Sequence, residues 1–160
     1  MDQPDALGNR AIHWATVQSS IRIILITHSR RAIDALNDEG LTPLAIAPKN
    51  GVGQAFETLV TIRADMDALD KNGNSIIHMA CEPKETGILH HLLSRGKFRS
   101  VQRNNNGQTP LHHAIEIGNV EAVKLLLEFQ AALNPSDLKG QTPLMAAVKA
   151  GNKEILRIID

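Results

Sequence analysis

Hydrophobic residues of this chain are grouped in pairs of short segments that recur along its length. In the clearest copy, the apolar segment 111–115 is followed almost at once by the amphipathic segment 120–127. The apolar residues of the second segment are three or four positions apart, which places them on one side of a helix: Val120, Val123, Leu126 and Leu127. Neither helix can bury its apolar side alone, so the pattern predicts stacked helix pairs.

A glycine-centred turn precedes each pair. The glycines are Gly8, Gly40, Gly73, Gly107 and Gly140, separated by 32, 33, 34 and 33 residues. An Asp or Asn stands three residues before each glycine, where its side chain can bond the turn backbone while glycine accepts a positive φ. The period predicts five tandem units within residues 5–160, approximately 5–36, 37–69, 70–103, 104–136 and 137–160.

The start of the first helix is marked most clearly in three units. Thr42, Thr109 and Thr142 are typical N-cap residues, and each is followed by proline at the first helical position. The sequences "TPLHHA" at 109–114 and "VEAVKLLL" at 120–127 resemble the ankyrin repeat family. The resemblance covers nearly all of 5–160 and is strongest in the last two units. It implies an all-α repeat solenoid in which each repeat is a turn, or finger, followed by two antiparallel helices.

Some units depart from this pattern. The first has "RAIHWA" at 10–15 in place of the Thr-Pro-Leu signature, and its second helix cannot be placed unambiguously. Pro48 falls where the first helix of the second unit should still run, so we expect that helix to be shortened or distorted. The third unit has Ser75-Ile76 for Thr-Pro and an additional residue near Pro83. We therefore expect irregular second and third repeats.

Composition narrows the class of protein. Lys plus Arg equals Asp plus Glu, 17 against 17, which argues against nucleic-acid or membrane binding driven by overall charge. Cys81 is the only cysteine, so an internal disulfide is excluded and a reducing compartment is indicated. The apolar segment 21–26 is too short to cross a bilayer, and the acidic Asp2 and Asp5 do not fit a signal peptide. We expect an intracellular protein of the cytoplasm, with the nucleus as an alternative.

Histidines are the first candidates for chemistry. His13, His78 and His112 occupy equivalent places in their units, and the resemblance implies that they bond backbone near the turns and link neighbouring repeats. His90, His91 and His113 are interpreted as surface or interface groups rather than metal ligands.

Three other features are candidate chemical sites. Cys81, three residues after His78, could form a nucleophilic pair, but a small buried side chain is the favoured interpretation. "GVGQ" at 51–54 lacks a full phosphate-binding pattern and is interpreted as a turn between helices. A basic segment contains Arg95, Lys97, Arg99 and Arg103. It could bind phosphate or an acidic partner, but a solvated loop is the favoured interpretation. No catalytic constellation, metal site or cofactor motif is predicted.

The resemblance implies a non-catalytic module that binds a protein partner through a concave face made of turn tips and the ends of first helices. The residues predicted to form this face are Asp38, Glu39, Leu41, Lys49, Lys71, Asn72, Asn74, Glu82, Asn105, Asn106, Gln108, Glu116, Leu138, Lys139, Gln141 and Lys149. A small-molecule substrate is not expected. Asn134 is a candidate for an intracellular asparaginyl hydroxylase, because ankyrin repeats often offer an asparagine at such a place.

An alternative is a targeting fragment of a larger protein: an enzyme, a channel, a transcription regulator or a host-directed effector. The last apolar segment carries Ile155, Leu156, Ile158 and Ile159 and is followed by no polar cap. We therefore expect Ile155 and Ile159 to be partly exposed or covered by another molecule.

Overall fold

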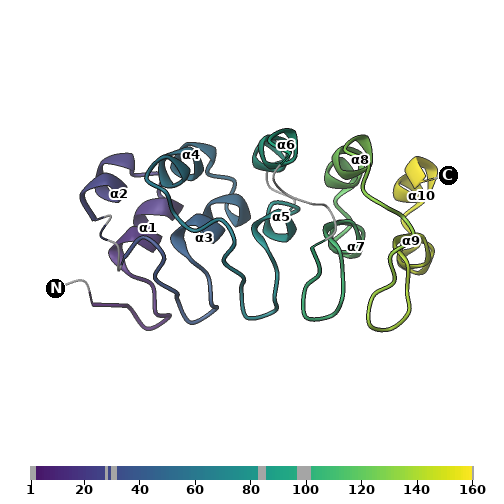
Figure 1. Ribbon diagram of the computed structural model, residues 1–160, viewed down its shortest axis with the longest axis horizontal. Helices are drawn as coiled ribbons and strands as arrows, with labels where there is room; N and C mark the ends of the chain where they lie inside the picture. The colour runs from purple at the N-terminus through teal and green to yellow at the C-terminus, as the bar shows by residue number, and fades with distance from the viewer. Residues whose placement is uncertain (1–2, 28, 30–31, 83–85, 97–101, 160) are drawn as a thin grey trace.

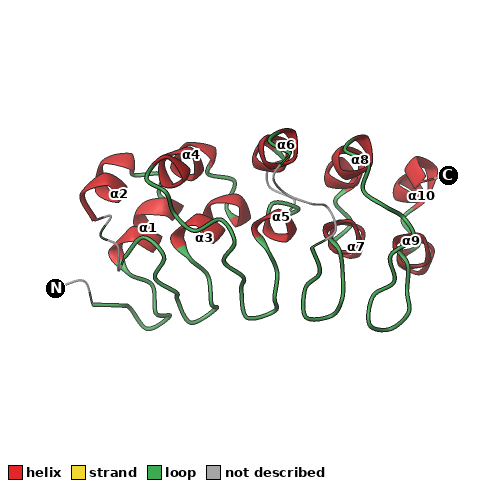
Figure 2. Cartoon of the chain, in the orientation of Figure 1, coloured by secondary structure: helices red, strands yellow, loops and turns green. Residues whose placement is uncertain are grey.

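The computed structural model describes residues 3–27, 29, 32–82, 86–96 and 102–159. These residues form ten helices and no strand (Figure 2). The helices come in five pairs: α1 (Ala11–Val17) with α2 (Ile21–Thr27), α3 (Pro43–Lys49) with α4 (Gly53–Thr61), α5 (Ile76–Met79) with α6 (Gly87–Ser94), α7 (Pro110–Glu116) with α8 (Val120–Glu128), and α9 (Pro143–Ala150) with α10 (Lys153–Ile159).

The pairs stand side by side in chain order, from α1 and α2 at one end to α9 and α10 at the other (Figure 1). The first helices of the pairs form one row, and the second helices form another row above it. The fingers extend from the first row, on the side away from the second helices. The expected all-α repeat solenoid is confirmed.

Each finger is held by the acid or amide at its start. The Oδ1 of Asp70 accepts hydrogen bonds from the backbone N–H groups of Asn72 and Asn74, at 2.9 and 2.7 Å. The equivalent residues of the other fingers, Asp5, Asn37, Asn104 and Asp137, accept the same two bonds. The finger glycines have φ between 73° and 77°. A Cβ at Gly107 would also lie 2.9 Å from the backbone nitrogen of Leu138 in the next finger, so a side chain is excluded there.

Backbone hydrogen bonds join successive fingers at three of the four junctions. Donors and acceptors are Asp38 N–H and the Leu7 carbonyl, Asn105 N–H and the Asn72 carbonyl, and Leu138 N–H and the Asn106 carbonyl, at 2.9–3.0 Å. Among the described residues, no such bond joins the second finger to the third.

The three Thr-Pro sequences begin helices as predicted. The hydroxyls of Thr42, Thr109 and Thr142 accept hydrogen bonds from the third helical N–H of α3, α7 and α9, at 3.1, 3.5 and 3.3 Å. The expected shortening of α3 by Pro48 is wrong, because α3 has seven residues, as α7 does. Pro48 lies in the last turn of α3, where its missing N–H removes only one helical bond.

The third pair is irregular, as predicted. Helix α5 has only four residues, and the Ser75 hydroxyl lies 2.9 Å from the His78 Nδ1. Pro83 lies outside the described residues.

One apolar core runs between the two rows of helices through all five pairs. Its fully buried members include Ile12, Leu44, Leu59, Ile77, Leu89, Leu111, Leu126 and Ile155. Each pair thus buries its neighbour's apolar side, as the repeat pattern requires. None of the described helices is long and apolar enough to cross a membrane.

The expectation for the chain end is only partly met. Ile159 is half-buried, but Ile155 is 0% exposed and belongs to the core. The prediction of an exposed Ile155 is therefore wrong, because α10 turns this side chain toward α8 and α9. The large exposed apolar residues of α9 at this end are instead Leu144, Met145 and Val148.

Candidate functional site

Two of the three equivalent histidines join their own repeat to the next one by the same bonds. In α7, the Nδ1 of His112 lies 3.2 Å from the Thr109 N–H, and its Nε2 lies 3.0 Å from the Gln141 carbonyl. His78 of α5 does the same with Ser75, at 3.3 Å, and with the Gln108 carbonyl, at 3.0 Å. These contacts fit a neutral ring in which Nε2 donates and Nδ1 accepts. We call the Nε2 contact the inter-repeat histidine bond.

His13 of α1 makes the corresponding contacts at the first junction. Its Nδ1 accepts from the Arg10 N–H at 2.9 Å, and its Nε2 lies 2.9 Å from the Ala35 carbonyl and 3.2 Å from the Leu41 carbonyl. All three histidines are buried. Their predicted structural role is confirmed, because both ring nitrogens are used within the scaffold.

The second repeat departs from this arrangement. Ala45 stands where three other units carry His13, His78 and His112, so no inter-repeat histidine bond joins the second repeat to the third. Leu41 stands where the other fingers have Asn or Gln. Leu41 and Ala45, with Ile46 and Met79, form a small apolar cluster separate from the main core.

A groove of about 480 Å³ lies over this cluster, and we call it the central groove. It is lined by Asp38, Glu39, Leu41, Lys49, Asp70, Lys71, Asn72, Asn74, Met79, Glu82 and His113. Its walls are the second and third fingers, together with residues from α3, α5 and α7. The Nζ of Lys49 lies 2.8 Å from the Glu39 Oε2, so these two charges are paired across the groove wall.

A second groove of about 310 Å³ lies between the last two fingers, and we call it the C-terminal groove. It is lined by Gln108, His112, Glu116, Asp137, Lys139, Gln141, Ala146, Lys149 and Ala150. The Gln108 Nε2 donates to the Glu116 Oε2 at 2.9 Å, so the finger and the end of α7 are joined on this wall.

The structure brings most of the predicted binding residues into these grooves. The central groove contains Asp38, Glu39, Leu41, Lys49, Lys71, Asn72, Asn74 and Glu82. The C-terminal groove contains Gln108, Glu116, Lys139, Gln141 and Lys149. The three that line neither groove are Asn105, Asn106 and Leu138, which lie exposed on the fingers.

One predicted binding residue is placed differently from the expectation. Leu41 is only 4% exposed, so it lies at the bottom of the central groove and does not project from the finger tip. Seven groove residues were not predicted: His112, Asp137, Ala146 and Ala150 in the C-terminal groove, and Asp70, Met79 and His113 in the central groove. Met79 and His113 directly follow His78 and His112 in the sequence. Their equivalent positions next to the structural histidines were the available signal.

His113 and His78 meet at the edge of the central groove, with ring centroids 6.0 Å apart and an interplanar angle of 67°. Burial lowers the pKa of His78 to about 4 and also lowers the pKa of His113. Both rings are therefore neutral at neutral pH, and the cationic groups of the groove are its lysines.

The remaining chemical candidates have structural contacts. The Cys81 thiol is buried and lies 3.2 Å from the Ile77 carbonyl, and burial raises its pKa, which disfavours a nucleophilic thiolate. Gly51 has φ 68° two residues after the end of α3, and α4 begins at Gly53, so "GVGQ" contains the turn between these helices.

His90 and His91 lie on α6, and His28 lies outside the described residues. His91 contacts the edge of the Phe56 ring and lies 3.2 Å from the Glu57 carboxylate, while His90 contacts the edge of Phe129. In the described part of the chain, no group of three or more His, Cys, Asp or Glu side chains could hold a metal ion.

Of the four basic residues at 95, 97, 99 and 103, the structure describes Arg95 and Arg103. Arg103 donates to the carbonyls of Gly107 and Ser136, at 2.8 and 2.5 Å, so it joins the fourth finger to the loop before the fifth. This structural role argues against Arg103 as part of a phosphate patch. Arg95 is exposed, while Lys97 and Arg99 lie outside the described residues.

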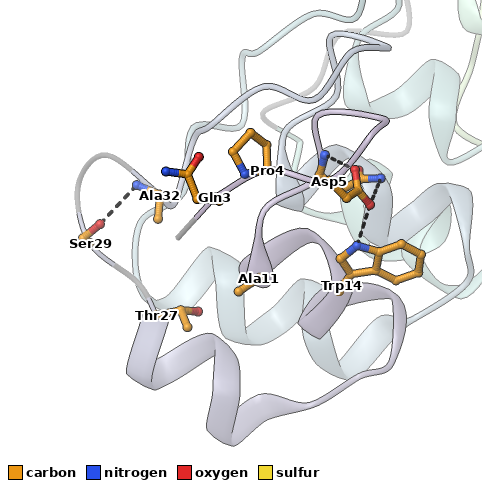
Figure 3. A pocket seen from close by; sticks show the side chains of 9 residues that line it. Gln3, Pro4, Asp5, Ala11, Trp14, Thr27, Ser29 and Ala32 are labelled. Carbon is orange, nitrogen blue, oxygen red and sulfur yellow. Dashed lines mark hydrogen bonds between the residues drawn. The ribbon is translucent and has the colours of Figure 1, made fainter. Parts of the chain in front are cut away.

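A hollow of about 600 Å³ lies at the N-terminal end (Figure 3). Among the described residues that line it, Asp5 is the ionisable one, and its Oδ2 accepts from the Trp14 Nε1 at 2.9 Å. Figure 3 shows these two side chains directed at one another. The described lining thus contains fewer charged groups than that of the central groove.

Comparisons with known proteins agree with the repeated architecture. A family model for ankyrin repeats matches residues 77–159. The B-cell lymphoma 3 protein homolog of Mus musculus is 36% identical over 143 residues, which are 84% of this chain and 32% of that protein. The tyrosine-protein kinase HTK16 of Hydra vulgaris is 36% identical over 107 residues, 66% of this chain and 14% of that protein.

The nuclear factor NF-kappa-B p105 subunit of Gallus gallus is 27% identical over 130 residues, 80% of this chain and 13% of that protein. The chain thus spans a third or less of the length of these relatives. Because the family model matches more than half of the sequence, and the helix pairs repeat with the same finger and histidine contacts, the chain belongs to the ankyrin repeat family.

Proposed function

We propose that this chain is a non-catalytic interaction module that binds a protein partner through its concave face, the side with the fingers and the two grooves. Ankyrin repeats are protein-interaction modules. We further propose that residues 5–160 act as a single domain of five repeats, with the approximate limits given by the glycine period.

The proposal is carried by one observation, which is that hydrogen bonds hold the fingers in fixed conformations. Each finger is fixed by its own Asp or Asn side chain, and most fingers are bonded to a neighbour. Side chains presented by such fingers lose little conformational entropy on binding. The grooves between them offer both charged and apolar contacts, as a protein partner requires.

Several observations favour binding over catalysis. The buried histidines are used in scaffold contacts, and the Cys81 thiol is buried with a raised pKa. The partner is proposed to be a protein rather than a nucleic acid or a small molecule, because positive and negative charges are balanced. We propose a cytoplasmic location, and the name of the nuclear factor relative supports the nucleus as the alternative.

Affinity capture with two charge-reversed variants tests the binding face. The first variant, Lys71→Glu with Glu116→Lys, changes the finger side, and the second, Lys124→Glu with Glu128→Lys, changes α8 on the other side. Both conserve net charge. We expect the first variant to lose the partner that the native chain captures and the second to retain it. The reverse result, with both variants folded, would place the interface on the second helices.

A second candidate function is recruitment within a larger protein. The relatives are several times longer than their matched region, and one carries the name of a tyrosine-protein kinase. Measuring the size of the native protein in its source cells discriminates the two. A mass near 17.4 kDa supports a free-standing module, and a larger mass supports a recruiting segment.

Asn134 is proposed as a modification site. It is exposed in the loop after α8, so an asparaginyl hydroxylase could reach its side chain. Mass spectrometry of protein made in cells that contain such an enzyme should find one added oxygen on Asn134. An unmodified Asn134 in those cells would contradict the proposal.

A further inference from the structure

The bottom of the central groove is apolar because the second repeat lacks polar residues that other repeats have. Leu41 replaces the Asn or Gln of the other fingers, and Ala45 replaces a histidine found in three repeats. Leu41 and Met79 are 4% and 5% exposed, yet both line the groove, so they form its floor. The apolar floor that Leu41 and Met79 form would pack favourably against an aliphatic side chain of a partner.

The walls above this floor carry an excess of negative charge. The carboxylates are those of Asp38, Glu39, Asp70 and Glu82, against the ammonium groups of Lys49 and Lys71. Lys49 is already paired with Glu39 at 2.8 Å. Among the described residues of the groove, three carboxylates therefore remain against the ammonium group of Lys71.

These carboxylates differ in what they do for the fold. The Asp70 carboxylate accepts the hydrogen bonds of its own finger, so it also serves the fold. The side chains of Asp38 and Glu82 make no hydrogen bond or ion pair with another described residue. Their charges are therefore available to a ligand, and their neutralisation should leave the fingers intact.

We propose that the central groove binds a basic peptide segment, with an aliphatic side chain over Leu41 and Met79 and a lysine or arginine beside Asp38 and Glu82. This inference rests on the proposed function, since it assigns the chemistry of the partner at one part of the same face. Complementary charges at these positions should favour a basic segment over an acidic one.

The C-terminal groove provides an internal comparison. Its carboxylates, Glu116 and Asp137, are balanced by the ammonium groups of Lys139 and Lys149. Its apolar contributors are the small side chains Ala146 and Ala150. It has neither the charge excess nor the Leu and Met floor, so a basic aliphatic peptide should prefer the central groove.

Binding of three short blocked peptides to the full chain tests the proposal. One alternates lysine and leucine, the second alternates glutamate and leucine, and the third alternates lysine and glycine. Amide shifts in two-dimensional NMR give both the site and the dissociation constant. We expect the lysine–leucine peptide to bind at least about tenfold more tightly than either other peptide, with salt weakening it.

The shifts should be centred on residues 38–41, 71–74 and 79–82. Equal binding of the lysine and glutamate peptides, or shifts centred on the C-terminal groove, would overturn the proposal. Equal binding of the leucine and glycine peptides would overturn the part assigned to the apolar floor.

A pair of isosteric variants tests the carboxylates. Asp38→Asn with Glu82→Gln should lower the affinity for the lysine–leucine peptide roughly tenfold. The control, Glu121→Gln with Glu128→Gln on α8, changes net charge equally and should leave the affinity unchanged. The same loss in both variants would show a response to net charge alone and would overturn the inference.

The outcome is separable from that of the proposed function. Suppose that the three peptides bind with equal affinity, while the variant with Lys71→Glu and Glu116→Lys no longer captures the partner. The inference about the central groove is then wrong, and the concave-face function stands. If capture is insensitive to those reversals, the concave-face function falls, whatever the peptides do.

Discussion

The Nε2 of His112 lies 3.0 Å from the carbonyl oxygen of Gln141, so a side chain on α7 holds the finger that precedes α9. The same ring accepts the Thr109 N–H at the start of its own helix. One neutral imidazole thus satisfies a helix end and links two repeats. The contact depends on both ring nitrogens, which explains why this histidine belongs to the scaffold.

Replacement of His112 by alanine should destabilise the C-terminal repeats. The change leaves the Thr109 N–H without the imidazole that accepts from it, and the Gln141 carbonyl keeps its bond from the Asp137 N–H but loses the one from the imidazole. The expected loss is about 1–3 kcal/mol in the free energy of unfolding. Hydrogen exchange should increase most in residues 137–159. His90→Ala, at an exposed position of α6, is the control and should cost much less. Equal losses would contradict the role of the inter-repeat histidine bond.

Leu111→Ala should lower the free energy of unfolding by roughly 2–5 kcal/mol, because Leu111 is fully buried in the core of the stack. Since each repeat contacts only its neighbours, the C-terminal repeats should lose protection before the first repeat does. Leu138→Ala removes the same atoms at a side chain that is 78% exposed and should cost within about 0.5 kcal/mol. Chemical denaturation measures both, and a similar small loss would contradict the assigned packing.

Acid should weaken the fold through His78. Burial lowers its pKa from 6.5 to about 4, so between these values the unfolded chain binds the proton more readily than the folded chain. Stability from this group is present above about pH 6.5 and is lost as the pH falls toward 4, by about 2 kcal/mol between neutral pH and pH 4.5.

His78→Gln removes this titration. The variant should be less stable than the native chain at neutral pH, because the bond to the Gln108 carbonyl is altered. The difference between the two proteins should narrow as the pH falls from 6.5 to about 4. Denaturant unfolding at several pH values checks this, and a constant difference would show that the native His78 pKa is not lowered.

Two apolar residues of the last helix pair should differ in how much stability is lost when each is replaced by glutamate. Val148 is 63% exposed, so Val148→Glu should change the free energy of unfolding by about 0.5 kcal/mol or less. Ile155 is fully buried, so Ile155→Glu should cost more than about 3 kcal/mol, because a carboxyl group would lack water and partners. Thermal melts of the two variants compare them, and equal tolerance would contradict the placement of α10.

The scaffold could be predicted from the sequence because its determinants are local and repeated. An acid or amide three residues before glycine fixes a finger, and Thr-Pro starts a helix, wherever they occur. The histidine role could be inferred from the family, since equivalent positions make equivalent contacts.

Features that depend on a single junction could not be predicted in the same way. The burial of Ile155 depends on how α10 rotates against its neighbours, and the role of Arg103 depends on two carbonyls from different segments. The burial of Leu41 had a signal, because it is apolar where the other fingers are polar. The partner-binding face stays a prediction, since no partner contact tests it.

The uneven bonding between repeats has a mechanical consequence. A solenoid stretched from its two ends carries the load through all its junctions in series, so the junction with the fewest cross-links determines where it yields. Between the second and third repeats, the described residues provide neither an inter-repeat histidine bond nor a backbone bond between fingers. Under tension the contacts between the second and third repeats would break first, which would separate the stack into blocks of two and three repeats. The central groove would then open before the interior of either block was disturbed.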